Sequence, residues 1–296
     1  MADPEVCCFL TKLLCKNKSG SSDVQGLSQK IGWSEAQLSQ ILQEARPERF
    51  LLVEDEDPSV AMAVAVSPLR LCGYYLRDEC DSCERLHLCK LFVQDRCRYK
   101  KQGYKCRFSH DIHLPGNSKI LKNNALFAIN ESELKVLLYQ NDPSLLPEVC
   151  PFYSRGEGPH GSCNLQDNCT KLHVCKHFIW RECRFQKCKR SHDLHTENAM
   201  KLLRDQGLNA STILNIQRIC KFKHGEICKS FDKKKASACL PPPSASDSHF
   251  SRPHPGCPLC LALLVCTLAL APALLTPAPD SGARPQPAHH PDLWST

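Results

Sequence analysis

LHLCKLFVQDRC spans Leu86–Cys97, and LHVCKHFIWREC spans Leu172–Cys183, 86 residues further along the chain. In both copies a cysteine follows the histidine by two residues, and a second cysteine comes eight residues later. A further shared string follows each copy, SHDIH at 109–113 and SHDLH at 191–195. The helical patterns after the two copies also match in order, which indicates a duplicated unit of roughly 80 residues.

The cysteine content decides which class of protein to consider. The chain has 296 residues, of which 21 are Cys and 13 are His. Such density belongs either to a secreted disulfide protein or to an intracellular metal-binding protein. Asp3 and Glu5 stand where a signal peptide needs basic residues, and no long apolar run follows them. We therefore expect a cytoplasmic protein whose thiols stay reduced and bind metal.

The middle of the chain contains four sets of three cysteines and one histidine, each ending in Cys-x3-His. Three thiolates and one imidazole make a closed tetrahedral set, typical of structural zinc, with no open position for water or substrate. We expect four structural Zn²⁺ ions and no catalytic metal. The predicted ligands are Cys72, Cys80, Cys83 and His87 (finger one); Cys89, Cys97, Cys106 and His110 (finger two); Cys150, Cys163, Cys169 and His173 (finger three); and Cys175, Cys183, Cys188 and His192 (finger four).

Some of the remaining cysteines also have an expected place. Cys7, Cys8 and Cys15 fall within the first predicted helix and are expected to be core residues. Cys220 and His224 repeat the Cys-x3-His step, but the Cys and His residues around them do not complete a fifth set. We therefore expect no fifth finger.

The fold class follows from the apolar spacing between these sets. Three short helices and a hairpin, with strands at 50–54 and 60–66, precede the fingers and are similar to a winged-helix domain. Ser34 with Gln37 forms a capping-box pattern. We expect a mainly α protein with small zinc-stabilised modules, divided into a winged-helix-like domain (1–70), finger pair 1–2 (71–110), a helical linker (111–149), finger pair 3–4 (150–192), a helical segment (193–224) and a disordered tail (225–296).

Four further helices are expected in the segments between and after the finger pairs. Between the finger pairs, one helix is predicted over 118–127 and another begins after an Asn130 cap. After finger four, helices are predicted over 196–205 and 211–219, and Gly207 ends the first of these two.

The tail carries an uncharged stretch, Leu259–Leu275, with the sequence LCLALLVCTLALAPALL. A membrane span needs about 20 residues, and Pro272 interrupts this shorter one. We do not expect membrane insertion. The two interpretations left open are a tail anchor and a tail without an evolved role.

Charge is distributed unevenly along the chain, whose formal net charge is +7. Residues 1–71 contain ten acidic and seven basic residues, so this domain favours protein contact over DNA binding.

Finger two has seven basic residues against one acidic residue, and finger four has six against one. Aromatic residues are interleaved with these cations, among them Tyr99, Tyr104, Trp180 and Phe185. Single-stranded RNA recognition needs cations for phosphate and flat side chains for base stacking. We expect fingers two and four to contact RNA, while fingers one and three brace them.

The chain resembles the zinc-finger antiviral protein family over about residues 1–224. The resemblance rests on MADPEVCCFLTKLLC at the start, PERFLL at 47–52, four CCCH fingers in two pairs and LLPEVC before finger three. QNDPSLLPEVC and CNLQDNC look closest to a short member of that family. The resemblance implies binding of viral or cellular RNA with CpG preference, recruitment of RNA-decay or antiviral cofactor proteins in innate defence, and no nuclease activity.

The resemblance also implies particular RNA-contacting residues. The family usually has Lys at the position of Arg107 and Tyr at the position of Phe108. Phe108 lacks the hydroxyl donor, and Arg changes donor geometry. We therefore expect a weaker CpG preference. The matching positions are Lys90, Arg96, Tyr99, Arg107 and Phe108 in finger two, and His177, Phe185 and Arg190 in finger four.

Three functional hypotheses follow from the sequence. The first is a non-catalytic protein that binds single-stranded RNA. The alternative is a scaffold or competitor that acts by protein contacts, with purely structural fingers. An enzyme is the weakest hypothesis, because no carboxylate cluster with metal-ligand spacing occurs outside the fingers.

Overall fold

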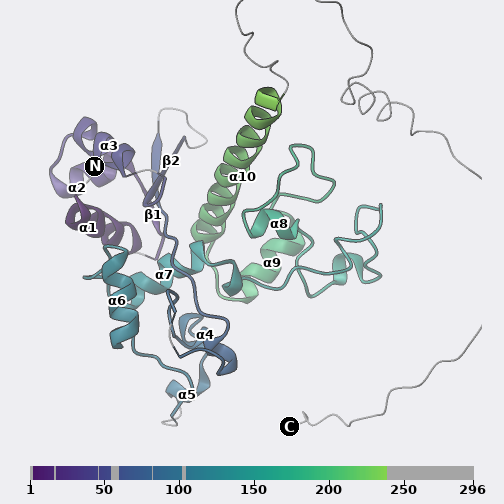
Figure 1. The fold of residues 1–296 in the computed structure, drawn as a ribbon, viewed down its shortest axis with the longest axis horizontal. Coiled ribbons are helices and arrows are strands. Elements are labelled where there is room, and N and C mark those ends of the chain that lie inside the picture. Colours follow the sequence, from purple (N-terminus) through teal and green to yellow (C-terminus); the bar gives the residue numbers. More distant parts are fainter. Residues whose placement is uncertain are drawn as a thin grey trace, which may run out of the picture. The chain divides into compact units, whose positions relative to one another are not determined.

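The structure is a computed structural model that describes residues 3–16, 18–45, 47–54, 60–81, 83–101 and 105–238 (Figure 1). The side chains of 100–101 and 234–238 are not described. The predicted mainly helical fold with small Cys/His modules is confirmed. The expected tail from residue 239 onward, including Leu259–Leu275, lies outside the described residues. Within the described residues, no helix combines the length and apolar composition needed to cross a bilayer.

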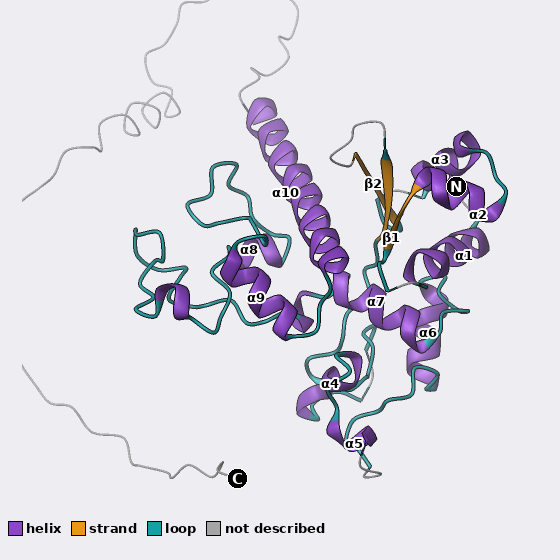
Figure 2. Ribbon diagram, turned by 180° about the vertical axis from the view of Figure 1, so that it is seen from behind, coloured by secondary structure: helices purple, strands orange, loops and turns teal. Residues whose placement is uncertain are grey.

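The N-terminal part packs three helices against a small antiparallel sheet with strand order β1-β3-β2. Figure 2 shows the strands together beside α1 and α3. The predicted capping box of Ser34 and Gln37 is present at the start of α3. The sequence missed β1, because three polar residues give no strand pattern. The elements are α1 (Pro4–Cys15), β1 (Ser21–Asp23), α2 (Val24–Ile31), α3 (Glu35–Glu44), β2 (Phe50–Glu54) and β3 (Ala61–Ala65).

Helices and loops make up the described residues that follow β3, and most of these helices are short. Asn130 and Glu133 form a capping box that begins α7, as the sequence predicted. The elements are η1 (Tyr75–Arg77), α4 (Lys90–Val93), α5 (Arg98–Lys101), α6 (Pro115–Asn123), α7 (Glu131–Asn141), η2 (Pro143–Leu145), η3 (Gln166–Asn168), α8 (Lys176–Ile179), α9 (Glu197–Asp205) and α10 (Ala210–Ala238).

Two helix boundaries differ from prediction. The helix expected over 118–127 is α6, which begins three residues earlier, with Pro115 in its first turn, and ends at Asn123. Proline favours the first turn because its missing N–H is unpaired there anyway. The helix expected over 211–219 is α10, which continues to Ala238, so the predicted tail over 225–296 begins too early. Buried Cys228 and half-buried Ile227 keep the later turns packed.

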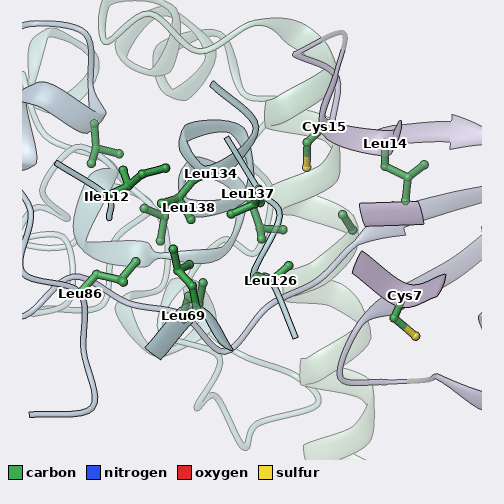
Figure 3. Close-up of a cluster of buried hydrophobic side chains, with 14 of the residues drawn as sticks. Cys7, Leu14, Cys15, Leu69, Leu86, Ile112, Leu126, Leu134, Leu137 and Leu138 are labelled. Carbon is green, nitrogen blue, oxygen red and sulfur yellow. The ribbon is translucent and has the colours of Figure 1, made fainter. Parts of the chain in front are cut away.

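Helix α7 lies at the centre of the largest hydrophobic cluster. Its Leu134, Leu137 and Leu138 are buried to 1% exposure or less. Figure 3 shows these leucines between Leu14 and Cys15 of α1 on one side and Leu86 of the finger region on the other. Burial of one such leucine contributes about 1.5–3 kcal/mol. The apolar face of α7 therefore joins the N-terminal domain to the first finger pair.

Two of the predicted core cysteines, Cys7 and Cys15, belong to this same cluster. Cys7, Cys8 and Cys15 are each at most 4% exposed, as expected. Burial raises the pKa of the Cys15 thiol well above its usual range, and the nearby Glu133 carboxylate adds to that effect. Burial also raises the pKa of the Cys7 thiol, so Cys7 and Cys15 are kept neutral.

Buried amides connect the N-terminal domain to α7 and α10. The Gln140 amide donates to the Gly20 and Ala65 carbonyls at 3.2 and 2.6 Å. Asn215 of α10 donates to the Gln140 side-chain oxygen at 3.1 Å and to the Ser19 carbonyl at 2.7 Å. Buried polar groups are costly unless paired, so this network fixes how three chain segments meet.

Gly20 gives a test of that junction. It has φ +69°, and a Cβ there would overlap the Gln140 side chain, whereas Gly32 has φ +72° and open space around it. Gly32→Ala should lower the free energy of unfolding by about 1 kcal/mol, because the only penalty there is backbone strain. Gly20→Ala should lower the free energy of unfolding by about 3 kcal/mol, because overpacking against Gln140 adds to the backbone strain. Urea unfolding of both variants measures the difference, and equal midpoints would contradict the role of the amide network.

Candidate metal centres and nucleic-acid interface

Each finger brings its four predicted ligand atoms together. In all four sets the donor atoms lie within 4.8 Å of one another. A tetrahedral zinc ion with Zn–S bonds of about 2.3 Å sets neighbouring sulfurs about 3.8 Å apart. The Sγ atoms of Cys106 and Cys89 are 3.8 Å apart, those of Cys188 and Cys175 are 3.8 Å apart, and those of Cys97 and Cys106 are 3.9 Å apart. These distances match zinc coordination.

The histidines show why a metal fits these sites. The Nε2 atoms of His173 and His192 are buried and have no hydrogen-bond partner among the described residues. Burial, together with the neighbouring His224, lowers the pKa of His192 to about 4. A neutral imidazole with a buried lone pair is the form that zinc requires. The donor set and its surroundings therefore fit four structural zinc ions.

An aromatic ring stacks on the histidine ligand in every finger. The ring always comes three residues after the first cysteine, at Tyr75, Phe92, Tyr153 and Phe178. The ring centroids lie 4.3–4.8 Å apart, with interplanar angles of 8–15°. Each ring covers one face of its imidazole and fixes the orientation of that ligand. The repeated Cys-x2-aromatic pattern in the sequence is the signal that could have predicted this stacking.

In fingers one and three the stacked ring is a tyrosine that also reaches the next finger. The Tyr75 hydroxyl accepts the backbone N–H of Ser109 at 2.9 Å, and the Tyr153 hydroxyl accepts that of Ser191 at 3.0 Å. Each serine directly precedes the last ligand of finger two or four. Its carbonyl accepts the N–H of the first cysteine, Cys89 or Cys175, at 2.8 Å. The bracing tyrosines therefore hold the ligand loops of fingers two and four.

Finger two presents its predicted RNA-contacting residues in different environments. Lys90 is half-buried at the start of α4, Arg96 is exposed, and the Tyr99 ring in α5 is 52% exposed. Arg107 forms an ion pair with Asp78 of finger one. Phe108 is half-buried and packs edge-on against Tyr75, with ring centroids 5.6 Å apart. Tyr104 lies outside the described residues.

Finger four shows the same division between exposed and engaged side chains. His177 is exposed, and Phe185 is 68% exposed. Arg190 instead contacts finger three, donating to the carbonyls of Arg155 and Gly158 at 3.4 and 3.1 Å and also to that of Gly156. Its guanidinium lies 5.2 Å from the centre of the Tyr153 ring. Arg190 therefore ties the two fingers together.

The region around Cys220 and His224 forms no fifth set of ligands within the described residues. Cys220 is buried and points to the Ile179 carbonyl. His224 instead approaches Cys228, with 3.4 Å between Nε2 and Sγ, and packs edge-on against His192. These α10 side chains therefore pack against Ile179 and His192 of finger four.

A winged-helix-like domain followed by two pairs of Cys3His modules defines a tandem CCCH zinc-finger protein. Residues 5–67 match the family model described as the Zap helix turn helix N-terminal domain. Residues 70–117 and 160–199 match the PARP12-like CCCH zinc finger tandem. Over 258 residues the chain is 43% identical to the human protein named zinc finger CCCH-type antiviral protein 1-like, covering 80% of this chain and 86% of that protein. The chain belongs to the zinc-finger antiviral protein family.

Two longer relatives match over part of their length. The rat zinc finger CCCH-type antiviral protein 1 is 41% identical over 228 residues, covering 76% of this chain and 29% of that protein. The human protein mono-ADP-ribosyltransferase PARP12 is 32% identical over 257 residues, covering 83% of this chain and 36% of that protein. The shared region is the one that carries the zinc fingers.

Zinc stoichiometry tests the four centres. Elemental analysis of the purified protein should give four zinc ions per chain. Cys89→Ser should reduce that number to three, because a serine hydroxyl does not replace a thiolate ligand. Cys228→Ser is the matched control and should leave four, since Cys228 belongs to none of the sets. A loss of zinc in the control would contradict the assignment.

The bracing tyrosines give a second test. Tyr75→Phe keeps the ring that stacks on His87 but removes the acceptor of the Ser109 N–H, and Tyr153→Phe does the same for Ser191. Loss of such a hydrogen bond costs about 1 kcal/mol, so hydrogen exchange at the serine amide should accelerate about fivefold. Each variant serves as the control for the other finger pair. Unchanged exchange at Ser109 in Tyr75→Phe would show that the hydroxyl braces nothing.

Proposed function

We propose that this protein is a non-catalytic antiviral factor that binds single-stranded RNA through fingers two and four, with some CpG preference. The observation that carries the proposal is the set of exposed aromatic and basic side chains on these fingers. Tyr99 and Phe185 are 52% and 68% exposed, and Arg96 and His177 of the same fingers are also exposed. A buried zinc module has no need of such residues on its surface. Stacking on exposed rings and contacts from cations to phosphates are what single-stranded RNA requires.

The engaged residues have a supporting role in this proposal. Arg107 contacts Asp78, and Arg190 contacts finger-three carbonyls. We assign both a positioning role that leaves part of each guanidinium for RNA. Phe108 packs on Tyr75 and offers a ring without a hydroxyl, so base discrimination should rest more on stacking than on hydrogen bonds. We therefore expect a modest CpG preference.

The names of the relatives support an antiviral role, and we propose that the protein acts in the cytoplasm. The family resemblance implies action by recruiting RNA-decay or antiviral cofactor proteins. The acidic N-terminal domain, proposed as residues 1–70, would leave RNA to the finger pairs at 71–110 and 150–192. We assign residues 111–149 and 193–224 as the helical segments that support these pairs.

RNA binding by the full chain tests the proposal. In fluorescence anisotropy with a CpG-containing single-stranded RNA, Arg96→Ala with Tyr99→Ala should weaken binding at least tenfold, because one phosphate contact and one stacked base are lost. Lys30→Ala with Phe9→Ala on the N-terminal domain is the matched control and should bind like the wild type. Replacing CpG by GpC should weaken wild-type binding only a few fold.

The alternative function is a scaffold with purely structural fingers. Phosphate contacts make RNA affinity fall steeply as salt is added. A scaffold would show no salt-sensitive RNA binding in the same anisotropy measurement. Its function would then rest on protein contacts made by the acidic N-terminal domain.

A further inference from the structure

The two copies of the repeated string differ at the residue that ends their short helices. In the first copy this residue is Gln94, which is 6% exposed and donates to the Leu145 carbonyl at 2.9 Å. In the second copy it is Trp180, which is 45% exposed. The finger can thus be built with a buried amide at this position. The fold of the finger alone does not account for an exposed indole there.

The backbone places Trp180 at the surface. The Trp180 N–H donates to the Lys176 carbonyl at 3.0 Å and closes α8. Arg181 follows in the left-handed region with φ 61°, and its guanidinium donates to the Gln140 carbonyl at 3.2 Å. The chain therefore turns towards α7 after Trp180, and Trp180 itself stays at the surface.

Trp180 lines a cavity of about 390 Å³ between the two finger pairs. The linker before finger three contributes an apolar part of the wall, including Pro143, Leu146 and Pro147. This volume lies within the range of about 300–1,000 Å³ that is typical of small-ligand sites. A single exposed tryptophan needs no explanation, but one on the wall of a cavity offers a stacking surface.

The polar part of the same cavity is mainly basic. Lys90 and Lys176 both line it, and each directly follows the first cysteine of its finger, so the duplication contributes one lysine from each copy. Lys171 forms an ion pair with Glu148 at 2.7 Å. With Glu148 neutralised by Lys171, the other two lysines are available to an anion.

We propose that this cavity binds one nucleotide of single-stranded RNA, with its base stacked on Trp180 and its flanking phosphates on Lys90 and Lys176. RNA held by finger two would then continue through the cavity to finger four. Since every base has a π-face, the site is tolerant of sequence. The inference rests on the proposed RNA binding and adds a subsite that links the two fingers.

The test compares the affinities of full-length variants for a fluorescein-labelled oligouridine 12-mer. Trp180→Ala should weaken binding about 5- to 150-fold, the range that corresponds to loss of one base–aromatic stack. Trp180→Phe should retain most of the affinity because it keeps a ring. Phe9→Ala is the matched control, since Phe9 is also 45% exposed but lies on the N-terminal domain. Zinc content confirms that each variant is folded.

Two further measurements locate the base and the phosphates. With Trp33→Phe and Trp294→Phe, Trp180 is the sole tryptophan, and oligouridine should quench its fluorescence. Lys90→Ala with Lys176→Ala should reduce the slope of log affinity against log salt by about 1.4, the value for two single-strand phosphate contacts.

The outcomes separate this inference from the proposed function. If the wild type binds RNA while Trp180→Ala binds equally tightly and Trp180 is not quenched, the cavity is not a nucleotide site, and RNA binding by the fingers still stands. If the wild type binds no RNA, the proposed function and this inference both fail. Weaker binding with rescue by Trp180→Phe, together with quenching, supports the subsite.

Discussion

Three sulfurs and one imidazole nitrogen lie within 4.8 Å of one another in each finger, and the rest of the finger region depends on their sharing a cation. Finger three shows this most clearly. Its buried cluster consists of Tyr153 and three of its own ligands, Cys150, Cys163 and Cys169. A core of that size cannot offset the conformational entropy of the roughly 24 residues that it orders. Metal binding therefore contributes the folding free energy of this module.

The ordering extends from the metal sites into the surfaces proposed to bind RNA. A ring stacks on each histidine ligand, and in fingers one and three the hydroxyl of that ring reaches the ligand loop of the next finger. Arg107 and Arg190 add contacts between paired fingers. Each basic finger is therefore held by a less basic neighbour, and its exposed rings keep a fixed position without the support of a large core. This arrangement reduces the ordering cost of binding a flexible RNA strand.

Duplication gave the chain two frameworks whose variable positions have diverged. Gln94 and Trp180 occupy the same place in the two copies, yet one is buried against Leu145 and the other lines a cavity. Lys90 and Lys176 have instead stayed equivalent, and both line that cavity. The shared positions preserve the zinc site and the short helix, while the others give each copy its own surface.

The sequence by itself determined the ligand sets, the repeat, the caps of α3 and α7 and the strands β2 and β3, because each depends on spacing or pattern within a few residues. Only the tertiary structure decided which cations are engaged, as Arg190 is, and which side chains meet around the Trp180 cavity. It also revealed β1, a strand of three polar residues that forms only by pairing with β3. These features depend on contacts between distant segments, such as Gln140 with Gly20, 120 residues apart. Local patterns carry no record of such partners, because the folded backbone alone brings them together.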